Sequence, residues 1–216
     1  MDKKEKLIFG NPGIYFITDS TLTRKNVIDD VKSAIKGGVK VIQYREKNYS
    51  KDKKLKECLE IRKLCSENHV LFLVNDDVDL AISCNADGVH LGKQDMAYET
   101  ARKKLGYEKI IGLSANTETE ALEMEKLGAD YIGLGPIFET STKKDAEAPV
   151  GTAVIKSLSL KLKIPLVVIG GINESNFEEI LSAGARNIAM ISSIVAKDDV
   201  EKEVRRYNKL ISNFYH

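Results

Sequence analysis

The sequence predicts one domain, a single (β/α)8 barrel that spans residues 1–216 and carries its active site at the C-terminal ends of the strands. Short runs rich in Ile, Val and Leu alternate with longer amphipathic stretches along the chain, which is typical of α/β architecture. One local pattern, a helix end followed at once by a strand, also recurs four times, at intervals of about 43 to 56 residues, the length of two β/α units. The pattern alone leaves an open, doubly wound sheet as the alternative.

The eight short apolar runs are predicted to be the strands. Most of their residues are apolar, with little alternation of apolar and polar positions, as expected of parallel strands that are covered on both faces. The runs are Gly13–Thr18, Val39–Tyr44, Leu71–Val74, Gly88–Leu91, Ile110–Leu113, Tyr131–Leu134, Pro165–Ile169 and Asn187–Ile191.

The predicted helices lie between these runs, and Lys51–Asn68 is the clearest of them. Most of its apolar residues follow helical spacing, with Lys and Glu on the other side. These apolar residues are Leu55, Cys58, Leu59, Leu64 and Cys65. We therefore expect Cys58 and Cys65 to be reduced core residues, since the three cysteines of the chain show neither metal-ligand spacing nor a disulfide framework.

The recurring pattern marks the point where a predicted helix ends and a strand begins. A Gly or Asn, which can adopt the left-handed conformation, stands at each of these helix ends. The four copies are Gly37–Val41, Asn85–Val89, Gly128–Ile132 and Gly184–Ile188.

Composition and charge narrow the classes of function. With 216 residues, 43% of them hydrophobic, the chain is long enough to bury a core. Its net charge of +1 predicts no general attraction to nucleic acid or membrane surfaces, so anions must be bound by locally placed groups. Met1–Lys6 lacks the apolar run of a signal peptide, and no window is long enough to span a membrane. We expect a cytoplasmic protein that acts on small molecules, alone or as a homo-oligomer.

Polar residues follow the predicted strands, which is where a barrel carries its active site. Gln43, Arg45 and Lys47 occupy alternate positions, so in an extended segment their side chains point to the same side. An amide, a guanidinium and an ammonium group in one place suit a polyanion. The alternative is a solvated strand end.

Carboxylates follow the third and fourth strands. Asp76 and Asp95 could together hold Mg²⁺, which takes one or two carboxylates and completes its shell with water and phosphate oxygens. An Asp at a helix start is commonly an N-cap instead, and this is the role expected of Asp77 and Asp79. His90, inside the fourth strand, is expected to be a hydrogen-bonded core residue.

Two further regions predict phosphate sites. The polar loop 135–150 has hydroxyls and lysines and is long enough to close over a ligand. Gly170-Gly171 and Ser192-Ser193 follow the seventh and eighth strands, where barrels often bind a phosphate monoester through backbone N–H groups. Because no Cys-His or Ser-His pair suggests a nucleophile, the sequence favours a reaction driven by stabilising a leaving group.

Five segments, in this order, resemble the thiamine phosphate synthase family, and the resemblance runs from Tyr15 to about Ala196. They are VIQYREK (41–47), LVNDDVDLA (73–81), ADGVHLGKQDM (86–96), GLGPIFETSTK (133–143) and VVIGGIN (167–173). The resemblance implies an enzyme that joins 4-amino-2-methyl-5-hydroxymethylpyrimidine pyrophosphate to 4-methyl-5-(2-phosphooxyethyl)thiazole, with Mg²⁺ as cofactor. Pyrophosphate would leave, and the thiazole nitrogen would capture the pyrimidinylmethyl carbocation to give thiamine phosphate.

The resemblance also implies a role for each matching residue. Those that would hold the pyrimidine pyrophosphate are Gln43, Arg45, Lys47, Asn75, Ser114 and Lys143. Of these, Arg45, Lys47, Ser114 and Lys143 would be catalytic, because they would stabilise the departing pyrophosphate. Asp76 and Asp95 would bind Mg²⁺. The thiazole phosphate would be held by Thr140, Thr142, Gly171, Ile191 and Ser192. Lys143→Ala is expected to lower turnover by on the order of 10²–10³.

Two positions depart from the family pattern: Asn116 stands where many relatives have His, and Glu139 where Pro is common. The related thiazole tautomerases need a general acid/base near the ring, and the resemblance implies that they use a histidine at the position of Asn116. The absence of this histidine, together with the intact sets Gln43/Arg45/Lys47 and Asp76/Asp95, favours the synthase. A non-catalytic sensor of thiamine precursors is a further alternative. Such a sensor could lose the metal-binding carboxylates. Because Asp76 and Asp95 are both present, the sequence favours an enzyme.

Overall fold

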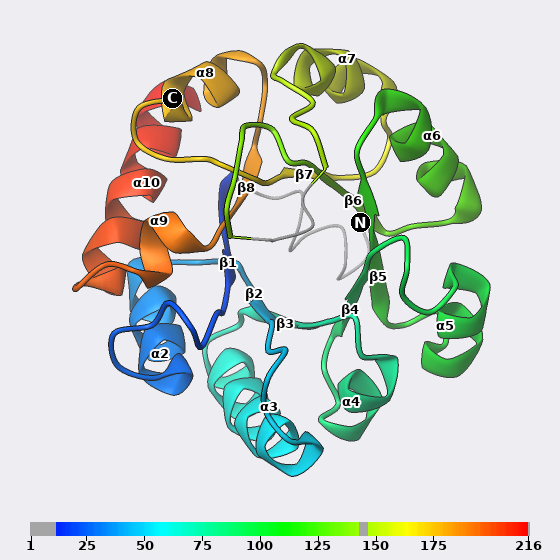
Figure 1. Cartoon of the computed structure of the whole chain (residues 1–216), viewed down its shortest axis with the longest axis vertical. Helices are drawn as coiled ribbons and strands as arrows, with labels where there is room; N and C mark the ends of the chain where they lie inside the picture. The colour runs from blue at the N-terminus through cyan, green and yellow to red at the C-terminus, as the bar shows by residue number, and fades with distance from the viewer. Residues whose placement is uncertain (1–11, 143–146, 216) are drawn as a thin grey trace.

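Eight parallel strands close into a barrel (Figure 1). The structure, a computed structural model, describes residues 12–142 and 147–215. Each strand pairs with the next one along the chain, and β8 pairs back onto β1 from Gly13↔Asn187 to Phe16↔Met190. The predicted (β/α)8 barrel is therefore confirmed, and the open doubly wound sheet is excluded.

Every strand begins and ends within two residues of the apolar run that predicted it. The strands are β1 (Gly13–Ile17), β2 (Val41–Tyr44), β3 (Leu71–Asn75), β4 (Gly88–Leu91), β5 (Ile110–Ala115), β6 (Tyr131–Leu134), β7 (Leu166–Val168) and β8 (Asn187–Met190).

Helices surround the barrel (Figure 1). They are α2 (Val27–Gly37), α3 (Lys51–Glu67), α4 (Val78–Ser83), α5 (Tyr98–Leu105), α6 (Glu118–Leu127), α7 (Ala153–Lys161), α8 (Phe177–Ser182), α9 (Ser192–Val195) and α10 (Val200–Tyr215). The last helix, α10, packs against α2, so the two ends of the helical layer meet where β8 joins β1.

The recurring helix-end pattern is confirmed. Gly38, Asn85, Gly128 and Gly184 follow α2, α4, α6 and α8, and their φ angles are 93°, 51°, 107° and 99°. Each is in the left-handed region, where Gly and Asn are favoured, and each ends its helix directly before the next strand.

The predicted face of α3 is correct for its cysteines and wrong for one leucine. Cys58, Ile61 and Cys65 are fully buried, and both cysteines are free thiols, as is the buried Cys84. Leu59, expected on the same face, is 51% exposed. Positions 58, 61 and 65 lie above one another on a helix, whereas position 59 is turned about 100° away from 58.

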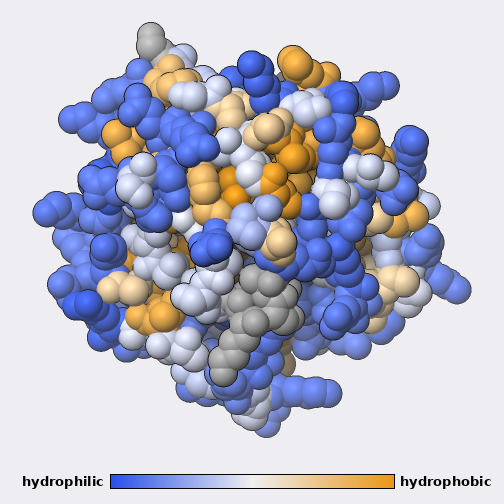
Figure 2. Space-filling view, turned by 45° about the horizontal axis from the view of Figure 1, so that its top comes forward, coloured by the Kyte–Doolittle hydropathy of each residue, from blue (hydrophilic) through white to orange (hydrophobic). Residues whose placement is uncertain are grey.

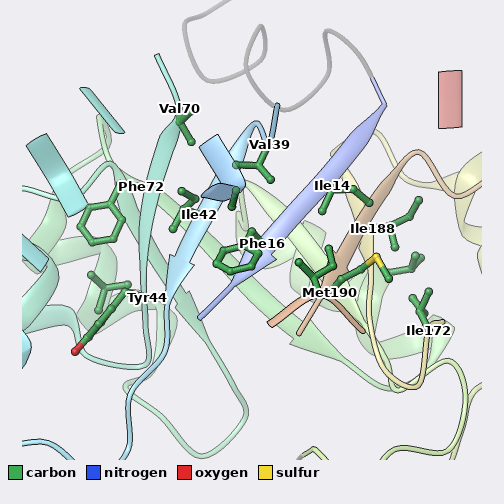
Figure 3. Packing of buried hydrophobic residues seen from close by; sticks show 14 of the residues in the cluster. Ile14, Phe16, Val39, Ile42, Tyr44, Val70, Phe72, Ile172, Ile188 and Met190 are labelled. Carbon is green, nitrogen blue, oxygen red and sulfur yellow. The ribbon is translucent and has the colours of Figure 1, made fainter. Parts of the chain in front are cut away.

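Alternate strand residues fill two separate cores. Phe16, Ile42 and Phe72, on three neighbouring strands, belong to the outer core beneath the helices (Figure 3). The other set, of opposite parity along the strands, fills the barrel interior: Tyr15, Ile17, Val41, Leu71, Leu73, Ile110, Tyr131, Val167 and Ala189. This packed interior forms a floor beneath the C-terminal ends of the strands.

One face of the molecule shows how polar and apolar side chains are distributed on the surface. The face in Figure 2 is mostly hydrophilic, with hydrophobic side chains in smaller groups between charged ones. This agrees with amphipathic helices that turn their polar sides outward. Within residues 12–142 and 147–215, no helix has the length and hydrophobicity needed to cross a bilayer.

Candidate active site

A cavity of about 350 Å³ lies at the C-terminal ends of the strands, and residues at or just beyond the ends of all eight strands line it. Twelve predicted site residues are brought together here: Gln43, Arg45, Lys47, Asn75, Asp76, Asp95, Ser114, Thr140, Thr142, Gly171, Ile191 and Ser192. Lys143, the remaining one, lies outside the described residues.

The loop after β1 holds Arg45 in place. Arg45 Nη1 donates to Asp19 Oδ2 at 2.9 Å, and the Arg45 backbone N donates to Thr18 Oγ1 at 2.9 Å. Asp19 is only 6% exposed, and its other oxygen accepts from the backbone N and hydroxyl of Thr21 at 3.0 and 2.5 Å. A buried carboxylate with this many donors is well satisfied, so it can fix the guanidinium at the edge of the cavity.

Lys47 is paired with a predicted metal ligand. Lys47 Nζ donates to Asp76 Oδ2 at 2.8 Å, with 58% of the Lys47 side chain exposed. The backbone of Asp76 has a φ of 64°, in the left-handed region that an Asp adopts only rarely. Strained backbone of this kind clusters at functional sites.

The carboxyl groups of Asp76 and Asp95 are close enough to share a hydrogen bond. Burial and the neighbouring Asp76 raise the pKa of Asp95. Burial also acts to raise the pKa of Asp76, but the hydrogen bonds with Lys47 and Asp95 outweigh it, and this pKa is lowered.

Two neighbouring carboxyl groups fit a divalent cation, because the cation relieves the repulsion between them. In the described part of the chain, no three His, Cys, Asp or Glu residues are grouped as metal ligands. Water and substrate oxygens would therefore have to complete the shell of a Mg²⁺ bound by Asp76 and Asp95, as is usual for this ion.

Hydrogen bonds link five side chains across the floor of the cavity. Gln43 Nε2 donates to the Tyr15 hydroxyl at 2.8 Å, and the Tyr15 and Tyr131 hydroxyls are 2.9 Å apart. His90 Nδ1 lies 2.8 Å from the Tyr131 hydroxyl, and His90 Nε2 lies 3.0 Å from Ser114 Oγ. Burial raises the pKa of both tyrosines, so they stay protonated.

His90 is hydrogen-bonded, as predicted, but it is not a core residue. It is half-buried and lines the cavity. Its position in β4 explains this, because it pairs in register with Asn75 and Gly112 on the neighbouring strands and shares their inward parity.

The loops after β6, β7 and β8 meet on another side of the cavity. Thr142 Oγ1 donates to Ser192 Oγ at 3.3 Å, and Ser192 is the first residue of α9. Gly171 has a φ of 66°, and a Cβ there would lie 2.3 Å from the Glu139 carbonyl oxygen. Only a glycine therefore allows the loop after β6 to approach this closely.

The remaining acidic and amide residues behave in different ways. Asp77 is the N-cap of α4, as predicted, since its Oδ1 accepts from Leu80 N at 2.9 Å, whereas Asp79 pairs with Lys104 at 2.8 Å. Asn116 lines the cavity and donates from its side-chain amide to the Gly135 carbonyl.

Sequence reasoning missed Tyr15, Asp19 and Tyr131. The two tyrosines stand in apolar strand runs and look like packing residues, and Asp19 looks like an ordinary turn residue after β1. The usable signal was strand parity, since Tyr15 and Tyr131 share their face with interior residues such as Gln43 and Ser114.

Comparisons with known proteins agree on one family. The family described as thiamine monophosphate synthase matches residues 14–194. The thiamine-phosphate synthase of Methanosarcina barkeri is 47% identical over 197 residues, covering 91% of this chain and 89% of that protein. That of Clostridium novyi is 45% identical over 192 residues, covering 88% of this chain and 94% of that protein.

Solved structures show the same likeness. The thiamine phosphate pyrophosphorylase from Pyrococcus furiosus has a TM-score of 0.88 and 37% identity, with 100% of both chains covered. The N-acetylmannosamine-6-phosphate 2-epimerase from Clostridium perfringens has a TM-score of 0.66 at 16% identity, with 97% of this chain and 96% of that chain covered, which shows a shared fold alone.

Proposed function

The chain belongs to the thiamine monophosphate synthase family, and from that premise we propose that it joins the pyrimidine pyrophosphate to the thiazole phosphate to form thiamine phosphate. It is a transferase of thiamine biosynthesis. The cytoplasmic location and the homo-oligomer expected from the sequence stay predictions.

One observation supports the proposed reaction: a single cavity has two sides whose groups are suited to anions. On one side, the cations Arg45 and Lys47 stand beside the paired carboxylates Asp76 and Asp95. On the other, the Thr142 hydroxyl donates to Ser192 Oγ, and Gly171 also lines the cavity. The first side suits a pyrophosphate with Mg²⁺ and the second a single phosphate.

In the proposed reaction, Arg45, Lys47 and Ser114 bind the pyrophosphate and stabilise the charge that develops on it as it leaves. Asp76 and Asp95 would hold Mg²⁺, which when bound would neutralise part of the same charge. Gln43 and Asn75 would orient the pyrimidine end. Lys143 would add a further cation to the leaving group.

The second substrate would be placed by the opposite side of the cavity. Thr140, Thr142, Gly171, Ile191 and Ser192 would hold its phosphate and so direct the thiazole nitrogen at the pyrimidine methylene. The nearby walls include Val167, Ile169 and Ala189, which are apolar. Such walls limit the access of water, which would otherwise capture the carbocation.

The rival reaction, thiazole tautomerisation, needs a general acid/base beside the ring. Asn116 has no proton to exchange near neutral pH, and its amide donates to the Gly135 carbonyl. Both ring nitrogens of His90 have hydrogen-bond partners at the floor. These contacts favour the synthase.

Product analysis by mass spectrometry tests the proposal. Purified protein is incubated with both substrates, with Mg²⁺ present or removed by a chelator. Thiamine phosphate and pyrophosphate that form only with Mg²⁺ are the expected result. No product from folded protein would overturn the proposal, and conversion of the thiazole tautomer alone would identify the rival enzyme. Binding of a thiamine precursor without turnover would instead indicate a sensor.

A further inference from the structure

Tyr15, Tyr131 and His90 connect Gln43 to Ser114 through an unbroken row of hydrogen bonds. The five residues come from five strands, and the two tyrosines are 116 positions apart in the chain. Gln43, Tyr15 and Tyr131 are at most 4% exposed. Polar groups that are buried and mutually satisfied tend to hold one arrangement.

Two directions of donation are open to the row, because either hydroxyl can donate between Tyr15 and Tyr131. In one direction, Tyr15 accepts from Gln43 Nε2 and gives its own proton to Tyr131, which donates to His90 Nδ1. A neutral His90 then carries its proton on Nε2 and donates to Ser114 Oγ. This direction is the one that we assign to the row. The Ser114 hydroxyl hydrogen is left for an acceptor in the cavity.

We propose that Tyr15, Tyr131 and His90 are positioning residues that hold the amide of Gln43 and the hydroxyl of Ser114 as one unit. The substrates in this inference rest on the proposed function. Gln43 would thereby keep one of its two amide orientations toward the pyrimidine ring, and Ser114 would face the pyrophosphate as a donor. A Ser114 that turned its lone pairs to the anion would repel it, so the direction of the row matters for the leaving group.

The barrel makes room for this row with two glycines. A Cβ at Gly112 would lie 2.0 Å from Tyr131 Cζ, and a Cβ at Gly133 would lie 2.7 Å from His90 Cε1. Gly112 pairs in register with His90 and Tyr131, and Gly133 pairs in register with Ser114. The rings of Tyr131 and His90 therefore fill space that the strands leave open for them.

The tautomer of His90 tests the row without any substrate. Long-range ¹H–¹⁵N NMR of the full chain shows which ring nitrogen of a neutral histidine carries the proton, and His69→Gln and His216→Gln variants leave His90 to be assigned. We expect the Nε2–H tautomer. The Nδ1–H tautomer would overturn the proposal, because the row would then run in the opposite direction.

A double-mutant cycle tests whether the row acts through Ser114. Tyr131→Phe keeps the ring and is expected to lower kcat/KM for the pyrimidine pyrophosphate about tenfold. In a Ser114→Ala background the same change should lower kcat/KM by about twofold or less, because the residue on which it acts is gone. Equal losses in both backgrounds would overturn the proposal. Tyr15→Phe, which breaks the same row, serves if Tyr131→Phe fails to fold.

Tyr44→Phe is the matched control. Tyr44 is a buried tyrosine next to Gln43, but its hydroxyl donates to Glu57 Oε2 at 2.8 Å, on the helix side of β2. Tyr44→Phe should leave kcat/KM within about twofold of the native value and should not change the tautomer of His90. If the native chain forms no thiamine phosphate, the proposed function fails, and the tautomer measurement still decides whether the row exists.

Discussion

Lys47 Nζ lies 2.8 Å from Asp76 Oδ2, so a cation proposed to bind pyrophosphate is paired with a carboxylate proposed to bind Mg²⁺. In the reaction, each must exchange this partner for another. Because the Lys47 side chain is 58% exposed, the pair contributes at most about 1 kcal/mol. The exchange is therefore energetically easy.

Replacing Lys47 by Met should change metal binding and turnover in opposite directions. Turnover is expected to fall by on the order of 10²–10³, because the leaving group loses a cation. Binding of Mg²⁺ to the substrate-free protein should tighten by up to about fivefold, because Asp76 loses a competing partner. Isothermal titration with Mg²⁺ and steady-state kinetics measure the two effects. Lys104→Met, which removes an exposed lysine paired with Asp79, should change neither.

Asp19→Asn should weaken pyrophosphate binding, although Asp19 is not proposed to contact the substrate itself. The change removes the charge that holds the Arg45 guanidinium, so KM for the pyrimidine pyrophosphate should rise about tenfold while KM for the thiazole phosphate stays near its native value. Asp87→Asn, which removes the partner of Arg62 outside the cavity, is the control and should leave both KM values alone. A rise in both KM values for Asp19→Asn would contradict a role confined to Arg45.

Asp95→Asn should stabilise the metal-free protein and abolish Mg²⁺-dependent turnover. An Asn oxygen can still accept from Gly92 N, the donor that lies 2.7 Å from Asp95 Oδ2, while the charge next to Asp76 disappears.

The stability gain should depend on pH with a definite sign. The pKa of Asp95 is raised in the folded protein, so at low pH Asp95 is protonated and the variant resembles the native chain. As pH rises through this pKa, the native protein alone gains the repulsion with Asp76 and loses stability relative to the variant. Thermal unfolding in chelator at a series of pH values measures the difference. A variant less stable than the native chain at neutral pH would contradict the repulsion.

Ser192→Ala should affect the thiazole substrate alone. Loss of a hydroxyl that meets Thr142 at the proposed phosphate site should raise KM for the thiazole phosphate about three- to tenfold. KM for the pyrimidine pyrophosphate should not change. Ser159→Ala on α7, where the hydroxyl donates to the Lys156 carbonyl of its own helix, is the matched control. Equal changes in both KM values would place Ser192 elsewhere in the mechanism.

The strands could be predicted because most of their residues are buried and apolar on both faces, as in Tyr131–Leu134, whose bounds are the predicted ones. The helix ends could be predicted because Gly128 and Gly184 supply a conformation that few residues adopt. Leu59 could not be assigned correctly, because hydrophobicity alone does not tell which of two adjacent residues faces the core.

The site was predictable where a polar side chain stands in an apolar strand, as Gln43 does, or directly after one, as Asp76 does. The structure brings these residues to one cavity, and their roles stay predictions. The roles of Tyr15 and Tyr131 were not predictable, because the hydroxyl that each one bonds belongs to a residue far away in the sequence. Lys143 lies outside the described residues, so its expected loss of turnover remains a sequence-based prediction.

The pairing of Phe16 with Met190 closes the barrel with the first and last strands of the chain. A ribosome releases the chain from its N-terminus, so β1 keeps an unpaired edge until β8 has emerged. That edge is exposed to wrong partners while residues 18–186 are made. The nascent chain carries Arg45 and Asp76 before it carries Ser192. The proposed binding of the thiazole phosphate, and with it catalysis, would therefore wait until β8 and α9 have been made.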